Sequence, residues 1–212
     1  MLILAGVFAT SFVIALSGAM MPGPLFATTI TASAKRGIIA GPALILGHAI
    51  LELAMVAAIL FGLAPLLTRD MVFACIALFG AAVLLWMSFS MIKSLPKTNV
   101  DWEAHDSSNA ENLVFQGIVM SMSNPYWTIW WATIGLGYIL YCRTLGLPGL
   151  AVFFAGHIMG DLSWYSLVSV IVAKGRHLLT IRVYRGLIGG CAVFISCFAL
   201  YFIYSGISRL AG

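Results

Sequence analysis

Long apolar stretches, separated by short polar or charged turns, dominate this chain. A helix needs roughly 20 residues to cross about 30 Å of hydrocarbon, and six charge-poor stretches reach that length. They lie near residues 3–33, 38–67, 71–92, 116–141, 147–173 and 185–208. The first two are longer than one straight crossing, which predicts tilt, a break or an interfacial end. The pattern therefore predicts an all-α polytopic membrane protein with six transmembrane helices.

The strongly hydrophilic connection between these stretches lies at residues 95–115 and holds four of the seven acidic residues. It has too few apolar residues to form a core, so we expect a loop. This loop divides the chain into a first unit, residues 1–94, and a second unit, residues 116–212. Each unit contains three apolar segments.

The composition excludes most soluble proteins. Of the 212 residues, 62% are hydrophobic and 8% are charged, whereas ordinary soluble domains carry about 25% charged residues. A soluble fold could not cover so much apolar surface, so lipid must be the solvent. The net charge of +4 comes from Lys and Arg residues scattered at the ends of apolar stretches. That distribution is typical of membrane anchoring and argues against nucleic acid as a partner.

The basic residues also predict an orientation. One set of turns carries Lys35, Arg36, Lys93, Lys97, Lys174, Arg176, Arg182 and Arg185, and the alternate turns carry Arg69, Arg143 and Arg209. The first set has eight basic residues and the alternate set has three. Because basic residues are enriched on the cytoplasmic side, this difference places the first set, with the 95–115 loop, in the cytoplasm. Both termini then face outward across the inner (plasma) membrane. We expect an outer aromatic belt of Tyr138, Tyr141, Tyr201 and Tyr204.

Two carboxylates, Glu52 and Asp161, lie midway along apolar segments. An ionised acid at the bilayer centre costs about 2.5–3.5 kcal/mol on insertion scales, so such residues usually face an interior cavity. We interpret both as groups that bind a solute or a proton. The alternative is a pair of buried acids that neighbouring hydroxyls or histidines satisfy for packing alone.

Each of these acids follows a histidine by four residues. His48 with Glu52 and His157 with Asp161 share the pattern Gly-His-x-x-x-acid-Leu, and the two copies are 109 residues apart. Spacing of four stacks the histidine and the carboxylate on one helical face. The offset of half the chain predicts two three-helix repeats, and the odd helix count inverts the second. The solute site then lies near the midplane, between the repeats.

Each unit also carries helix-breaking residues in its first segment: Pro22, Gly23 and Pro24 in one, Asn124 and Pro125 in the other. Proline inside a helix frees a backbone carbonyl and bends the axis. In hydrocarbon the freed group needs protein, water or ligand as a partner. We expect these breaks to border a solute site, with a plain structural kink as the alternative. Strict inversion would mirror the depths of the two breaks, yet both lie near the cytoplasmic turns.

Two further sets of residues recur at helical spacing. The first is an aromatic stripe of Tyr126, Trp127, Trp130 and Trp131. Lipid-facing bulk is its simpler interpretation, and a cavity wall is the alternative for any ring that faces inward. The second set comprises the small-residue pairs Gly156 with Gly160 and Gly186 with Gly190, which we interpret as helix-packing sites.

Pro22-Gly23-Pro24, the basic turn Lys35-Arg36-Gly37 and Asn124-Pro125 together resemble the LysE/RhtB family of amino acid exporters, over nearly the full length. Residues 123–135 and 156–169 look like a LysE-type branch of that family. The resemblance implies proton-motive-force-linked efflux of amino acids or similar small metabolites, with a homodimer as one assembly it allows. Residues 80–93 depart from the pattern of better-known members, so the resemblance does not identify the solute.

The leading hypothesis is therefore a proton-coupled exporter, in which Glu52 and Asp161 bind a proton and a solute ammonium group in turn. A divalent metal transporter is the second hypothesis, because two histidines and two carboxylates offer a mixed nitrogen and oxygen site. An intramembrane zinc hydrolase and a non-catalytic scaffold are less favoured. The chain has no phosphate-binding loop, zinc-protease helix or nucleophile elbow, so we expect neither an enzyme nor a resident cofactor or metal.

Overall fold

The computed structural model describes residues 1–67, 69–95, 112–175 and 180–211, and all regular structure within them is helical. The α-helices are α1 (Leu2–Ala19), α2 (Pro24–Arg36), α3 (Ala40–Ala58), α4 (Ala64–Leu67), α5 (Asp70–Ser94), α6 (Leu113–Met122), α7 (Pro125–Trp130), α8 (Leu136–Arg143), α9 (Gly146–Gly175) and α10 (Ile181–Ala211). A 3-10 turn, η1 (Gly37–Ile39), and two π-helical turns, η2 (Ile59–Leu63) and η4 (Trp131–Gly135), join some of them. The all-α prediction is confirmed.

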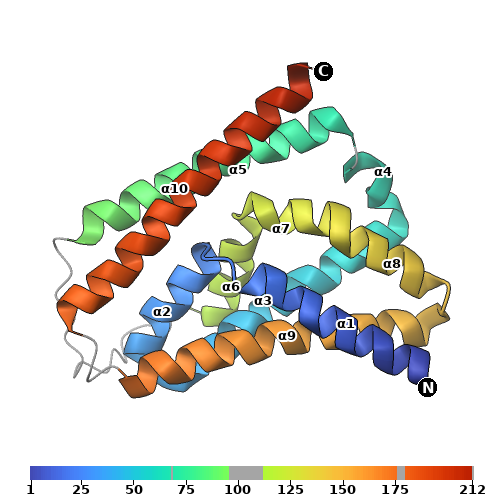
Figure 1. Cartoon of the computed structure of the whole chain (residues 1–212), viewed down its shortest axis with the longest axis horizontal. Helices are drawn as coiled ribbons and strands as arrows, with labels where there is room; N and C mark the ends of the chain where they lie inside the picture. Colours follow the sequence, from blue (N-terminus) through green and yellow to red (C-terminus); the bar gives the residue numbers. More distant parts are fainter. Residues whose placement is uncertain (68, 96–111, 176–179, 212) are drawn as a thin grey trace.

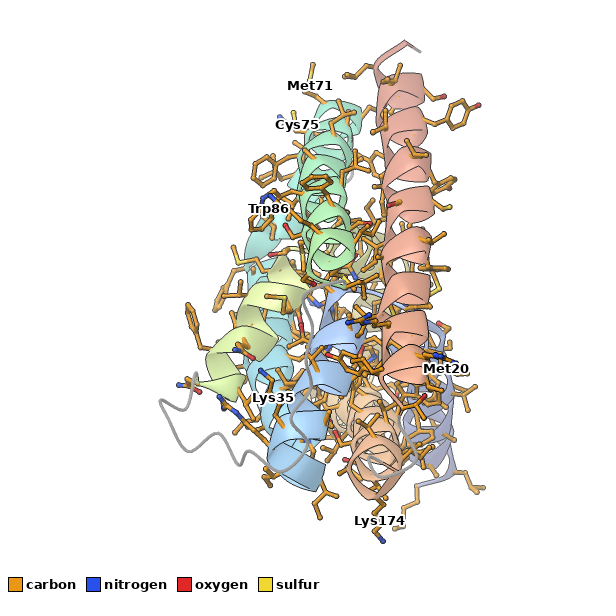
Figure 2. All side chains as sticks on the ribbon, turned by 90° about the vertical axis from the view of Figure 1, so that its left-hand side faces the viewer. Met20, Lys35, Met71, Cys75, Trp86 and Lys174 are labelled. Carbon is orange, nitrogen blue, oxygen red and sulfur yellow. The ribbon has the colours of Figure 1, made fainter. Side chains whose placement is uncertain are left out.

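Four helical stretches in the described part of the chain are long and apolar enough to cross a membrane. They are Leu2–Ala19, Pro24–Leu67 taken as one stretch, Asp70–Ser94 and Ile181–Leu210. Large apolar side chains cover their outer surfaces: Trp86 is 69% exposed, and Figure 2 shows it on the outside of α5. An apolar exterior of this kind suits lipid rather than water. The protein is therefore a multi-span membrane protein.

Three helix pairs organise the molecule (Figure 1): α5 lies along α10, α1 along α9, and α3 along α6. Ser88 of α5 fixes the first pair, because its hydroxyl donates to the carbonyl of Ala192 in α10 at 2.7 Å. Asp70 and Arg209 join the other ends of the same two helices by an ion pair. The α1–α9 and α3–α6 pairs meet in the middle, where α3 also packs against α9.

The first apolar segment is broken, which is one of the three outcomes (tilt, a break or an interfacial end) expected from its length. It ends as α1 at Ala19 and resumes as α2 at Pro24, with Gly23 extended at φ −114° and ψ −172°. Proline suits the first turn of α2 because its fixed φ matches the helix and its missing N–H would have no helical acceptor there. The break therefore follows directly from the Pro-Gly-Pro sequence.

The fourth segment is broken in a similar way. Asn124 precedes α7, and its side-chain oxygen accepts from the backbone N–H of Tyr126 at 3.1 Å, which caps the new helix. Pro125 occupies the first turn. The segment starts with α6 at Leu113, earlier than the expected residue 116, because Asn112 caps that helix too. The rest of the expected 95–115 loop lies largely outside the described residues.

Glycines allow close helix contacts at the centre of the fold. A Cβ on Gly156 would meet the Phe8 carbonyl at 2.6 Å, and one on Gly160 would meet the Phe12 carbonyl at 2.7 Å, so α1 approaches α9 through these two positions. Here the packing prediction is confirmed. It is wrong for Gly186 and Gly190 within the described part of the chain, where a Cβ at either position would meet nothing within 4 Å.

The reason for this error is the face that α10 uses. It packs on α5 through four residues that are almost fully buried: Ala192, Ile195, Ala199 and Phe202. Small residues at helical spacing permit a contact, but they do not create one on a face that meets no partner helix. Gly186 and Gly190 lie away from the packed face.

The ends of the helices agree with the predicted charge asymmetry. Figure 1 shows that α2, α5 and α9 end, and α10 begins, toward the same side of the molecule. Lys97 and Arg176 of the predicted inner set lie outside the described residues.

Candidate functional site

The two histidine–acid pairs come together where α3 and α9 pack. His48 Nε2 lies 3.0 Å from Glu52 Oε1 on its own helix and 3.6 Å from Asp161 Oδ2 across the interface. His157 Nε2 lies 3.4 Å from Asp161 Oδ2 and 3.1 Å from Glu52 Oε2. All four residues are buried, and both acids are at most 3% exposed. We call these four residues the central cluster.

Glycines next to the histidines make this meeting possible. A Cβ on Gly47 would overlap the Val114 carbonyl of α6, and a Cβ on Gly156 would overlap α1. Gly41 lies equally close to the Tyr165 carbonyl of α9. Because backbones approach this closely only at small residues, the Gly-His pattern packs α3 on α6 and α9 on α1 and places the titratable side chains in the interior.

Two tryptophans from the broken fourth segment donate hydrogen bonds to Glu52. The indole N–H of Trp127 lies 3.2 Å and that of Trp131 lies 3.0 Å from Glu52 Oε1. Trp131 is fully buried and Trp127 is half-buried. The lipid-facing interpretation of the stripe is therefore wrong for these rings, because a buried carboxylate requires donors. The four-residue spacing of the two tryptophans, directly after Asn-Pro, is the only pattern in the sequence that points to this role.

The two histidines have different surroundings. His48 Nδ1 lies 2.7 Å from the Ser121 hydroxyl of α6, which also contacts the Gly117 carbonyl at 2.7 Å. His157 packs among aromatic rings instead, with the centroid of Trp130 at 4.8 Å and that of Trp131 at 5.4 Å. Its Nδ1 has no hydrogen-bond partner within the described residues. Ser121 orients one histidine and rings confine the other, and the sequence alone indicated neither contact.

A cavity of about 60 Å³ adjoins the central cluster. All four cluster residues line it, and so do Gly23 and Asn124 from the two helix breaks. Its volume is enough for about five waters. The prolines of the breaks are not among the residues that line the cavity. Pro24 is buried, and Pro125 packs where a Cβ of Gly80 on α5 would lie. Pro22 is half-buried within the first break.

The two breaks meet on one side of the cluster. A Cβ on Gly23 would lie 3.3 Å from Asn124 Nδ2. The first break follows the 18 residues of α1 and the second follows the 10 residues of α6, which correspond to about 27 Å and about 15 Å of helix. The helices α1 and α6 thus differ in length and run in from opposite ends of the molecule, yet the breaks that follow them lie side by side. The depths are therefore not mirrored, and the cavity has both breaks on its wall.

The donor set would also suit a cation. His48, Glu52 and Asp161 each offer one ligand atom, and these atoms lie within 4.8 Å of one another. Nitrogen with two carboxylates fits a borderline divalent metal. The same atoms are already engaged in contacts with one another at 3.0–3.6 Å, so the arrangement equally suits an ammonium group or a proton.

Apolar membrane helices around a buried, charged cluster and a small cavity define a membrane transport protein. Residues 16–206 match the model of the LysE type translocator family, and the chain belongs to that family. It is a membrane transporter and not an enzyme. A Bacillus subtilis (strain 168) protein named "Putative amino acid efflux protein YcgF" is 27% identical over 208 residues, which cover 97% of this chain and 99% of that protein. No solved structure matches the chain.

Proposed function

We propose that this protein is a secondary transporter that exports amino acids or similar small metabolites across the plasma membrane, with the proton motive force as its energy source. The family and the name of the Bacillus subtilis protein support export of an amino acid. The observation that carries the mechanism is the central cluster, in which α3 and α9 place two histidines and two carboxylates beside one cavity. We propose the plasma membrane because such exporters release their solute from the cell.

The chemistry of the cavity wall suits both ends of an amino acid. Buried carboxylates attract an ammonium group in a medium of low dielectric constant. The first turn of α2, which begins at the cavity-lining Gly23, has no side-chain cap. Its N–H groups and the positive end of the helix dipole favour a carboxylate. The solute ammonium and a proton compete for the same carboxylates, which gives the exchange that couples their movement.

We propose six spans arranged as two inverted repeats. In this arrangement α1 with α2 corresponds to α6, α7 and α8 taken together. The helix α3 then corresponds to α9, and α5 corresponds to α10. The contact of α1 with α9 then corresponds to that of α6 with α3, and both use the glycine that precedes a cluster histidine, Gly156 in one and Gly47 in the other. The helix α9, with 30 residues, is about 45 Å long and so reaches across a bilayer.

Counterflow in proteoliposomes tests the proposed function. Liposomes that contain the full chain and one unlabelled amino acid should accumulate the labelled form when that amino acid is a substrate. Combined Glu52→Gln and Asp161→Asn replacement should abolish accumulation because both carboxylates of the cavity are lost. Asp70→Asn, which removes an exposed acid at the end of α5, is the control and should leave it unchanged. If no amino acid gives counterflow, the proposal is wrong.

Divalent metal transport is the second candidate, because His48, Glu52 and Asp161 converge within 4.8 Å. It predicts stoichiometric binding of Zn²⁺ or Mn²⁺ in a calorimetric titration. It also predicts that a chelator abolishes flux. Amino acid counterflow that persists in the chelator would exclude it.

A further inference from the structure

The two carboxylates of the central cluster have different hydrogen-bond donors. Glu52 Oε1 accepts from the indole N–H of Trp127 and of Trp131. Within the described residues Asp161 receives no such donor: its nearest charged neighbours are His157 Nε2 at 3.4 Å and His48 Nε2 at 3.6 Å. Neither Asp161 Oδ2 nor Glu52 Oε2 has a hydrogen-bond partner there, so the two acids differ in the indole donors on Glu52 Oε1. The repeated sequence pattern does not predict this difference.

The donors on Glu52 are permanent. An indole nitrogen only donates, and it does not lose its proton in the accessible pH range. Two such donors on one oxygen stabilise the ionised form of a carboxylate, because hydrogen bonds to a charged group are stronger than hydrogen bonds between neutral groups. Trp131 is fully buried and cannot rotate away without opening the core. Glu52 Oε1 is thus held by two donors that stay in place.

Asp161 differs because it accepts no indole N–H within the described residues, and its unpaired oxygen lies in a residue on the wall of the cavity. A buried acceptor without a donor costs free energy, so a ligand that supplies N–H groups binds there favourably. His48, Glu52, Tyr126, His157 and Tyr165 are the titratable residues that share this wall with Asp161. An ammonium group, which has three donors and a positive charge, matches the unpaired oxygen.

A complementary donor lies on the same wall. Trp130 is 5% exposed, and its indole Nε1 has no partner within the described residues. This nitrogen lies 3.8 Å from the position of a Cβ on Gly18, which also lines the cavity. Within the described residues, four buried side-chain atoms of the lining residues have no hydrogen-bond partner: Glu52 Oε2, Asp161 Oδ2, His157 Nδ1 and Trp130 Nε1. Of the two acids, Glu52 already accepts two indole N–H groups on its other oxygen, whereas Asp161 accepts none from an indole there. A zwitterion supplies an ammonium donor for Asp161 and a carboxylate acceptor for Trp130.

We propose that Asp161 binds the ammonium group of the solute and that Trp130 donates a hydrogen bond to its carboxylate, which the first turn of α2 also favours, while Glu52 is a positioning residue that Trp127 and Trp131 hold in place. This inference rests on the proposed function and assigns unequal roles to the two acids. The cavity volume of about 60 Å³, enough for about five waters, suits a small zwitterionic amino acid.

A comparison of ligands and variants tests this assignment. The twenty protein amino acids are screened by thermal shift on the purified full chain. The amino acid with the largest shift is then compared with its α-hydroxy acid, which lacks the amine, and with its decarboxylated amine. In the wild type the amino acid should bind about tenfold or more tightly than either, as one hydrogen bond to a charged group predicts.

Asp161→Asn should remove the preference over the hydroxy acid, and Trp130→Phe should remove the preference over the amine. Glu52→Gln should weaken all three ligands and keep both preferences. A preference over the hydroxy acid that survives Asp161→Asn, or disappears in Glu52→Gln, would overturn the assignment while leaving amino acid transport intact. A wild type that binds none of the twenty would overturn the proposed function as well.

A second measurement needs no variant of an acid. With ¹⁵N-labelled tryptophan, the six indole signals are assigned by Trp→Phe replacements. Addition of the selected amino acid should move the Trp130 signal more than the Trp127 and Trp131 signals. Larger shifts at Trp127 and Trp131, with Trp130 unchanged, would show that Glu52 exchanges its partners and would refute the proposal.

Discussion

Replacement of Trp131 by phenylalanine should destabilise the folded protein more than the same change at the adjacent Trp130. Both rings are buried and lose the same atoms, so the packing contribution largely cancels between them. Of these two, Trp131 donates to Glu52 at 3.0 Å, whereas the Trp130 nitrogen has no partner in the described residues. A hydrogen bond to a charged group contributes about 1.5–3 kcal/mol, and the difference should be of that size.

The assay is a denaturant titration in mixed micelles, followed by circular dichroism. Trp127→Phe should give a smaller loss than Trp131→Phe, because its bond is 3.2 Å long and its ring is half-buried. In a double-mutant cycle, Trp131→Phe and Glu52→Gln should couple by at least about 1 kcal/mol. Equal losses at Trp130 and Trp131, or additive effects in the cycle, would refute the hydrogen bond to Glu52.

Three further predictions follow from the fold and the cluster. Gly156→Ala should cost about 1–3 kcal/mol of unfolding free energy, because its Cβ overlaps α1, whereas Gly186→Ala should be neutral or stabilising by up to about 1 kcal/mol; equal losses in a thermal scan would contradict the packing. His48→Gln and His157→Gln should shift the pH at which transport is half-maximal without abolishing flux; unchanged pH profiles in both would exclude a tuning role. Tags at the two termini should be accessible from outside intact cells, and protection of both would reverse the proposed orientation.

The sequence predicts the central cluster well because its information is local. Four-residue spacing puts His48 beside Glu52 and His157 beside Asp161, and the shared pattern indicates that the two pairs belong to one site. The breaks at Gly23 and Asn124 follow from proline and capping chemistry in the same way. These features depend on a few neighbouring residues, which is why they can be inferred before the structure is known.

The parts that could not be predicted depend on how distant segments pack. Trp127 and Trp131 reach Glu52 only because the second break turns α7 toward α3, and no local rule sets that direction. Gly186 has the same small-residue spacing as Gly156 but meets no helix in the described part of the chain, since spacing does not say which face is covered. The cavity arises between α1, α2, α3, α6, α7 and α9, so no single segment of the sequence encodes it.

The central claim is that the buried carboxylates couple solute movement to protons, and proteoliposomes loaded with a pH-sensitive dye test it directly. With an imposed pH gradient, the wild type should move its amino acid uphill, and the dye should report protons moving in the opposite direction. Asp161→Asn should lose this coupling, while Asp70→Asn should retain it. Uphill movement that persists in Asp161→Asn, or amino acid flux in the wild type without any proton movement, would contradict the account.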